Sequence, residues 1–270
     1  MTVEHQVVRT KSGHLAMLST ADGEVMHPGV GPLAEARDLY VVQSRLQERL
    51  ALSDRTLTVF DVGLGAGSIA LAARSVAEAG AAGQAALEIV SFERDLDALV
   101  VALEHPAAFG LEGEPGLAAR ALLAEGRHTT ARTAWRLAHG DVFEQLARET
   151  TRADIVYWDM YSPRKQPMFW TVAAFAQVRS VAGPACTLFT YSASTASRIA
   201  LLCAGWAVGL GTSIGEKWQT TAAAVRLEDL AQPLTIDWLR RLRRADVPLP
   251  SDVPADFLAR IEAMPQFRSV

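Results

Sequence analysis

The sequence predicts a doubly wound α/β domain built on a mostly parallel sheet of seven strands. From about residue 51 to residue 230, short runs rich in β-branched residues alternate with alanine-rich stretches of helical period. That alternation is the pattern of parallel strands joined by crossover helices on both faces of a sheet. Half of the 270 residues are hydrophobic, which is enough to build a sizeable core.

The first 50 residues precede this alternation and form a separate part of the prediction. Residues 6–10 and 14–18 alternate polar and apolar side chains around a Lys-Ser-Gly turn, which predicts an N-terminal β-hairpin. Apolar residues then recur at helical spacing over residues 33–50, which predicts a covering helix, broken near Val42.

Seven segments in the middle of the chain are predicted as the strands of the sheet: 57–62, 87–92, 134–138, 154–158, 185–190 and a final pair at 204–210 and 220–227. Residues 109–128, between the second and third strands, are rich in Gly, Glu and Ala and predict a helical or irregular insertion. Prolines punctuate short amphipathic pieces after residue 230. We therefore expect three parts: 1–50, a catalytic domain over 51–230, and a tail over 231–270.

Composition excludes several classes of function. The net charge of -4 argues against a nonspecific nucleic-acid binder, so any RNA would be held by a local patch. The two cysteines, Cys186 and Cys203, lie in apolar runs without a second ligand at metal spacing, so we expect no disulfide, no metal and a cytoplasmic location. Neither a signal peptide nor an apolar span is evident, so we expect no membrane partner. The oligomeric state is not predicted.

A glycine-rich segment follows the first predicted strand: Asp61-Val-Gly63-Leu-Gly65-Ala-Gly67. Glycines at a strand-to-helix turn let the backbone approach a ligand beside the free N–H groups of the helix. The G-x-G-x-G spacing differs from the G-x-G-x-x-G of dinucleotide enzymes, and the acidic leader favours a cationic ligand without phosphate. The segment predicts an S-adenosylmethionine site; the alternative is a tight turn made only for packing.

Two further acidic residues follow the next two strands. Glu93 ends the second strand, where it could accept hydrogen bonds from both ribose hydroxyls; the alternative is a solvated loop residue. Asp141 follows the third strand, where it could accept from an adenine amino group, or cap the helix predicted over residues 142–148. Together with the glycine segment, these residues strengthen the prediction of a nucleoside cofactor.

The fourth strand ends at Asp159, which is the leading candidate for the reaction site. Ligands of open α/β sheets react beyond the carboxyl ends of the strands, and a carboxylate there could orient an amine and accept its proton. Tyr161 and Trp170 could flank a flat substrate ring. The alternatives are helix capping for Asp159 and core packing for the two aromatic residues.

Residues 25–225 resemble the methyltransferase domain of MnmC-type enzymes. The segment from Asp159 to Thr171 is similar to the family's D-G-F-x-P-x-K-N-P-x-M-W-T, with Lys165 at its lysine, and residues 91–94 match its S-F-E-K. The stretch containing Glu35, Tyr40 and Val41 resembles the family's segment before the first core strand. The resemblance adds Glu35 to the cofactor site and Lys165 to the substrate site.

The resemblance implies methyl transfer from S-adenosylmethionine to the amine of 5-aminomethyl-2-thiouridine at the wobble position of tRNA, with Asp159 at the reacting centre. It also implies a stand-alone form, because bifunctional members carry a further flavin-dependent oxidoreductase domain. The chain departs from the family at Met160 and Tyr161, and at residues 211–220, where a basic segment is missing.

These departures leave other acceptors open: a small-molecule or protein amine, or no acceptor at all in a silent relative that binds cofactor or RNA. A nicotinamide dehydrogenase is disfavoured by the glycine spacing and the lack of a catalytic His or Tyr-Lys pair. Arg164 and Lys165 near the site, with four arginines over residues 240–244, permit RNA binding, although a basic helical face is more often a solvated surface.

Overall fold

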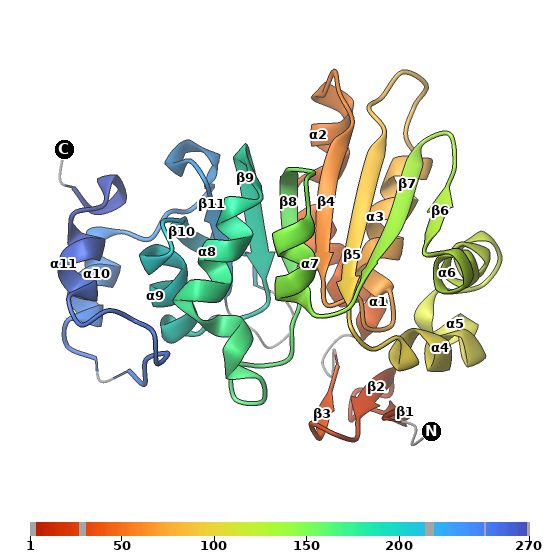
Figure 1. The fold of residues 1–270 in the computed structure, drawn as a ribbon, viewed down its shortest axis with the longest axis horizontal. Coiled ribbons are helices and arrows are strands. Elements are labelled where there is room, and N and C mark those ends of the chain that lie inside the picture. The colour runs from red at the N-terminus through yellow and green to blue at the C-terminus, as the bar shows by residue number, and fades with distance from the viewer. Residues whose placement is uncertain (1–3, 27–30, 214–218, 246, 269–270) are drawn as a thin grey trace.

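The computed structural model describes residues 4–26, 31–213, 219–245 and 247–268. Within these ranges the main sheet has eight strands in the order β10-β11-β9-β8-β4-β5-β7-β6 (Figure 1). β4, β5, β7, β8 and β9 are parallel, whereas β6, β10 and β11 pair antiparallel. The strands are β4 (Leu57–Val62), β5 (Leu87–Glu93), β6 (Arg127–Thr129), β7 (Thr133–His139), β8 (Ala153–Trp158), β9 (Ala182–Thr190), β10 (Ala207–Gly211) and β11 (Thr220–Ala224).

The doubly wound prediction is confirmed, but the expected number of seven strands is wrong. The additional strand, β6, pairs with β7 at the edge of the sheet and lies at the end of the segment predicted as an insertion. β6 has three residues, Arg-His-Thr, none of them apolar. A run this short and polar carries no alternation from which a strand could be predicted.

Helices cover both faces of the sheet (Figure 1). Residues of η1, α2, α3, α4 and α6 pack in one buried cluster, and residues of α7 to α11 pack in the other. Neighbouring β4 residues divide between the clusters, Val59 in the first and Phe60 in the second, because successive side chains of a strand point to opposite faces. The helices are α1 (Pro32–Glu35), α2 (Leu46–Leu52), α3 (Ser68–Glu78), α4 (Asp97–Glu104), α5 (Pro106–Phe109), α6 (Glu114–Glu125), α7 (Val142–Arg148), α8 (Val172–Ser180), α9 (Thr195–Cys203), α10 (Ile236–Leu242) and α11 (Phe257–Glu262), with the π-helix η1 (Ala36–Val42) and the 3-10 segments η2 (Pro167–Trp170), η3 (Leu227–Asp229) and η4 (Pro265–Phe267).

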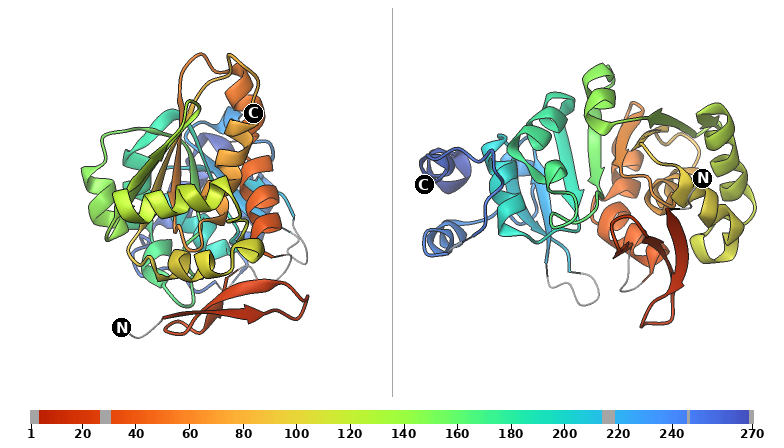
Figure 2. Two further views of the ribbon diagram at one scale, coloured as in Figure 1. Left: turned by 90° about the vertical axis from the view of Figure 1, so that its right-hand side faces the viewer. Right: turned by 60° about the horizontal axis from the view of Figure 1, so that its bottom comes forward.

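The N-terminal segment forms a three-stranded antiparallel sheet of β1 (His5–Arg9), β2 (Leu15–Ser19) and β3 (Glu24–Val25). The predicted hairpin is therefore present, with a third strand of only two residues added to it. This small sheet lies below the carboxyl ends of the main strands in both the front and the side view (Figures 1 and 2). It stands where it can cover a ligand bound at that edge.

The predicted covering helix is broken, as expected, but most of its first half is a π-helix. η1 ends at Val42, and the chain then turns at Arg45, a non-glycine residue with φ of 55°, before α2 begins. A π-helix is rare and costs hydrogen-bond geometry, so it occurs mostly at functional sites. Apolar spacing alone does not distinguish it from an α-helix.

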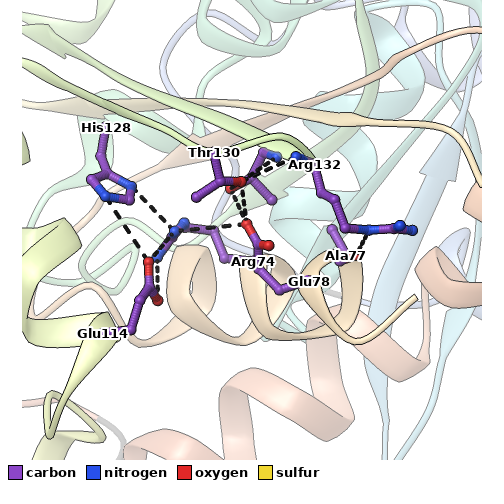
Figure 3. A network of polar contacts seen from close by, with 8 residues as sticks. Arg74, Ala77, Glu78, Glu114, His128, Thr130 and Arg132 are labelled. Carbon is purple, nitrogen blue, oxygen red and sulfur yellow. Dashed lines mark hydrogen bonds and ion pairs between the residues drawn. The ribbon is translucent and has the colours of Figure 1, made fainter. Parts of the chain in front are cut away.

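A polar network fastens the predicted insertion to α3 (Figure 3). The Arg74 guanidinium, which is 2% exposed, donates to Glu114 at 2.8 Å and contacts Nδ1 of His128 at 3.2 Å. One turn further along α3, Glu78 accepts a hydrogen bond from Thr130 at 2.6 Å. The insertion thus rests on the helix that begins at the glycine segment.

The tail joins the core of the second face: Trp238 of α10 and Ile261 of α11 are buried in the same cluster as residues of α9, and α11 contacts α9 directly. The division of the chain into three parts stays a prediction. No helix in the described part of the chain is long and apolar enough to cross a membrane.

Candidate active site

The order of the main sheet creates a crevice between β4 and β8. The chain runs outward from β4 to β5 and β7 on one side and from β8 to β9 on the other, so the loops after β4 and β8 diverge. Ligands of open α/β sheets bind at such a switch point, beyond the carboxyl ends of the strands. A cavity of about 460 Å³ lies there, lined by the strand tips and by the N-terminal sheet.

The glycine segment forms one wall of this cavity. Gly63 has φ of 91°, and a Cβ atom there would lie 2.7 Å from the carbonyl oxygen of Asp159, so only glycine fits between the two strand tips. Gly63 and Gly65 line the cavity. Gly67 caps α3 with φ of 84° and packs against Leu99, so the packing interpretation describes this third glycine.

The Glu93 carboxylate lines the cavity and is fixed by the backbone around it. Oε1 accepts from the N–H groups of Arg94 at 2.8 Å and Asp95 at 3.0 Å, and Oε2 accepts from the N–H of Gly65 at 3.2 Å. Burial nevertheless raises the pKa of Glu93. A carboxylate anchored to the glycine segment is not a freely solvated loop residue, and its two oxygens can accept more hydrogen bonds than the three they receive here.

Asp61 is placed differently from its prediction, since it lies beneath the glycine segment and does not reach the cavity wall. Its side chain is 1% exposed, and Oδ2 accepts from the hydroxyl of Ser91, its neighbour on β5, at 2.7 Å. Oδ1 is buried with no hydrogen-bond partner. Burial raises the pKa of Asp61 to about 7. An unpaired buried oxygen here adds acceptor capacity under the cofactor loop.

Asp141 lines the cavity and also caps α7. Its Oδ1 accepts from the N–H groups of Phe143 at 2.9 Å and Glu144 at 3.2 Å, so the capping alternative is confirmed. Because the side chain also borders the cavity, capping does not remove it from the set of candidate ligands.

Asp159 follows β8 and lines the cavity beside Gly63 of the glycine segment. Its N–H donates to the carbonyl of Val62 at 2.9 Å, and its Oδ1 accepts from the hydroxyl of Tyr40 at 2.5 Å. The capping alternative does not describe Asp159, because the next helical segment begins only at Pro167. Glu35, which is 4% exposed, lies in the same wall.

Of the three candidate substrate residues, Tyr161 lines the cavity, whereas Lys165 and Trp170 do not. Tyr161 lines the cavity and its hydroxyl lies 3.1 Å from Nε2 of His5. Trp170 is buried in the core, where its ring packs edge-on against Phe175 and its Nε1 donates to the Tyr161 carbonyl at 2.8 Å. The core-packing alternative therefore describes Trp170, which is buried, bonds to the Tyr161 backbone and does not line the cavity. Lys165 is exposed and lies outside the cavity wall.

The N-terminal sheet supplies residues to the cavity that the sequence did not suggest. Asp22 accepts from the side chain of Gln166 at 3.1 Å, and Glu24 accepts from the hydroxyl of Ser162 at 2.9 Å, which joins the sheet to the loop after β8. Both carboxylates line the cavity. The alternation that predicted the strands gives no sign of where they pack.

Negative charge dominates the described lining. Eight carboxylates border the cavity, against a single arginine: Glu4, Asp22, Glu24, Glu35, Glu93, Asp95, Asp141 and Asp159, with Arg94. Such a concentration in a partly desolvated crevice creates a strongly negative potential, which attracts cations and repels phosphate. The arrangement suits a ligand that carries a sulfonium and an ammonium group.

Comparison with known proteins agrees with this chemistry. Residues 119–226 match the model of a family described as S-adenosyl-L-methionine-dependent methyltransferase. The chain is 31% identical over 212 residues to the tRNA 5-methylaminomethyl-2-thiouridine biosynthesis bifunctional protein MnmC of Pseudomonas aeruginosa, and 29% identical over 204 residues to that of Pseudomonas putida. The alignments cover 74% and 71% of this chain. They cover 32% and 31% of those relatives, so the chain matches about a third of their length.

Among solved structures, MnmC2 of Aquifex aeolicus superposes with a TM-score of 0.73 at 23% identity, covering 96% of this chain and 86% of the other. The chain is an S-adenosylmethionine-dependent methyltransferase that is similar to the MnmC proteins. Spermidine synthase of Thermotoga maritima has a TM-score of 0.54 at 11% identity, with 96% and 84% covered, and shares the fold with this MnmC-like chain.

S-adenosylmethionine fits the residues that the MnmC-like chain presents. The backbone of Gly63 and Gly65 borders the cavity, the anchored Glu93 offers an acceptor, and Asp61 holds a buried oxygen without a partner beneath the glycine segment. The surrounding carboxylates suit the positive charge of the cofactor.

Proposed function

We propose that this chain methylates the amine of 5-aminomethyl-2-thiouridine at the wobble position of tRNA. The observation that supports this acceptor best is the position of Asp159, which faces the cofactor cavity from the tip of β8 and begins the segment most similar to MnmC. An acidic pocket favours an amine acceptor, because the approaching group is itself a base that carries a proton in water.

The cofactor supplies an electrophilic methyl group. In the proposed site, Glu93 accepts from the ribose hydroxyls, the backbone of Gly63 and Gly65 borders the cofactor, and Asp141 accepts from the adenine amino group. Asp61 contributes negative charge from below, and Glu35 from the wall of α1. Gly67 acts indirectly, by allowing α3 to begin where it does.

Asp159 orients the acceptor amine by accepting a hydrogen bond from it. The amine nitrogen forms the new N–C bond as the S–C bond breaks, the bonding electrons pass to sulfur, and the nitrogen releases one proton. In this proposal the Asp159 carboxylate receives that proton, a contribution worth roughly 10²- to 10⁴-fold in rate for a well-placed base. Tyr161, with its hydroxyl on His5, borders the acceptor.

The tRNA itself would be held by residues outside the cavity. Lys165 is exposed beside the loop after β8 and is proposed to contact phosphate. Arg240 and Arg243 of the tail already form ion pairs with Asp237 and Glu262, so the solvated-surface interpretation describes these two. Gly215 and Lys217, in the segment that departs from the family, lie outside the described residues. A tRNA substrate also implies a cytoplasmic location.

The test is incubation with methyl-labelled S-adenosylmethionine and tRNA that carries 5-aminomethyl-2-thiouridine, followed by nucleoside mass analysis. We expect label on the wobble nucleoside and at least a 100-fold lower rate for Asp159→Asn. Binding of S-adenosylhomocysteine by calorimetry serves as the control, since Asp159→Asn should retain it. Cofactor binding without labelling of tRNA would reject the proposed acceptor and leave a small-molecule or protein amine.

A further inference from the structure

The π-helix η1 carries a residue that reaches the proposed reaction centre from outside the cofactor motifs. Tyr40 is completely buried, and its hydroxyl donates to Oδ1 of Asp159 across 119 positions of sequence at 2.5 Å. The ring is held edge-on against Tyr157, with centroids 5.5 Å apart and planes at 65°. A buried tyrosine normally finds one polar partner, and this one has the carboxylate at the tip of β8.

The segment that carries Tyr40 is fixed on its far side as well. Gln43, the residue after η1, accepts a hydrogen bond through Oε1 from the hydroxyl of Thr212 at 2.6 Å, and its backbone N–H donates to the carbonyl of Tyr40. The wide turn of a π-helix changes the direction of a side chain relative to an α-helix of the same sequence. The π-helical turn, with its less favourable hydrogen bonds, therefore lies where it directs the Tyr40 side chain toward Asp159.

We propose that Tyr40 is the positioning residue of Asp159: its hydroxyl holds the carboxylate in one rotamer and favours the ionised form that receives the proton of the acceptor amine. The inference rests on the proposed role of Asp159. Tyr40 does not line the cavity, whereas its partner Asp159 does, so Tyr40 acts through the carboxylate and does not touch substrate.

The charges around Asp159 explain why a neutral donor is needed. Glu35 from α1, Asp61 from β4 and the Tyr191 phenol after β9 face the same region, and the carboxylates oppose a further negative charge. Burial and the Asp159 carboxylate raise the pKa of Tyr40 far above its ordinary value, so its proton stays on the oxygen as a donor. One strong hydrogen bond to the charged form offsets part of the repulsion.

The decisive variant is Tyr40→Phe, with Tyr157→Phe as the matched control. Tyr157 is an equally buried tyrosine whose hydroxyl meets Ser44 at 2.8 Å, and the phenyl ring retained in the control preserves the contact with Tyr40. We expect Tyr40→Phe to lower kcat roughly 10- to 100-fold with KM for S-adenosylmethionine within about 3-fold, and to move the acidic limb of the kcat profile to higher pH. Tyr157→Phe should change none of these by more than about 3-fold.

Coupling separates this role from a general loss of structure. In an Asp159→Asn background, Tyr40→Phe should cost less than about 2-fold, because the partner it acts through is gone. Equal losses in both backgrounds would overturn the proposal, and so would a kcat for Tyr40→Phe equal to that of the wild type.

A second measurement needs no acceptor. Carboxyl carbon NMR titration, with Asp159→Asn assigning the signal, should show the pKa of Asp159 about one unit higher in Tyr40→Phe than in the wild type or in Tyr157→Phe. An unchanged titration would overturn the inference. If tRNA is not methylated at all, the proposed acceptor fails while this titration still decides the role of Tyr40.

Discussion

Replacing Asp61 by Asn should stabilise the protein at neutral and alkaline pH while weakening the cofactor site. Asp61 is 1% exposed, one oxygen has no partner, and burial raises its pKa from 3.8 to about 7. The difference of about 3 units corresponds to about 4 kcal/mol at 1.36 kcal/mol per unit. That value is the upper limit of the destabilisation that the ionised carboxylate imposes on the fold.

The pH dependence follows from linkage. Well below pH 3.8 the carboxyl is protonated in both the folded and the unfolded state, and Asp61 imposes no ionisation cost. As the pH rises from about 4 to about 7, the unfolded state loses the proton while the folded state keeps it, so the free energy of unfolding falls. Above about pH 7 the whole cost is present, and the Asn variant, which cannot ionise, avoids it.

Equilibrium urea unfolding of the wild type and Asp61→Asn at a series of pH values between 4 and 8 measures this effect. The free energy of unfolding of the variant relative to the wild type should increase with pH up to about 7 and then stay constant. Loss of the hydrogen bond from Ser91 would shift the difference in unfolding free energy by the same amount at every pH, so it does not affect how that difference changes with pH. A difference that is flat across the series would show that Asp61 is solvated or paired and would refute the reasoning. Calorimetry should show weaker S-adenosylmethionine binding, since the buried charge favours a cation.

Three further outcomes follow from the site and its supports. Glu93→Ala should raise the Kd for S-adenosylhomocysteine roughly 30- to 100-fold in calorimetry, because charge-assisted hydrogen bonds are lost. The control Glu88→Ala lies outside the cavity and should leave the Kd unchanged. Equal effects of the two variants on the Kd would contradict the ribose role of Glu93. Gly63→Ala should reduce cofactor affinity at least about 10-fold and lower the urea midpoint of unfolding, because the new Cβ would lie 2.7 Å from the Asp159 carbonyl oxygen. If the variant bound the cofactor as tightly as the wild type, the two strand tips could separate to make room for the Cβ. Arg74→Ala should lower the free energy of unfolding by about 2 to 3 kcal/mol, because the bonds to Glu114 are lost. The Kd for S-adenosylhomocysteine should stay within about 3-fold of the wild-type value. A larger change in that Kd would mean that the network also shapes the glycine loop.

The parts of the molecule that repeat a local pattern were predictable. β4, β5, β7 and β8 were found within one residue at each end, because each is a short apolar run followed by a glycine or an acidic residue. The carboxylate at Glu93 was predictable for the same reason, since the end of a strand fixes the edge at which a side chain emerges. β6 has no such pattern, and its three polar residues join the sheet only because α6 brings them there.

The contacts between distant segments were not predictable. Tyr40 belongs both to the apolar spacing that predicts a helix over residues 33–50 and to the resemblance, but nothing in the surrounding sequence distinguishes a π-helix from an α-helix or points its hydroxyl toward Asp159. For Trp170 the sequence predicted a substrate contact, but the residue is in the core, because an aromatic residue near a reactive segment can equally well be a core residue. For Asp61 the sequence identified the segment but not how deeply the side chain is buried, because that burial depends on β5 and β8 pairing with β4 on either side.

The small N-terminal sheet has a consequence for synthesis of the chain. Asp22 bonds to Gln166 and Glu24 bonds to Ser162, so these bonds cannot form until the ribosome has added most of the catalytic domain. The glycine segment and β5 emerge much earlier and can pair as soon as both are outside the exit tunnel. The residues of this sheet are made well before residues 162 and 166, yet they are among the last to reach their final contacts, so the cofactor pocket closes only late in folding.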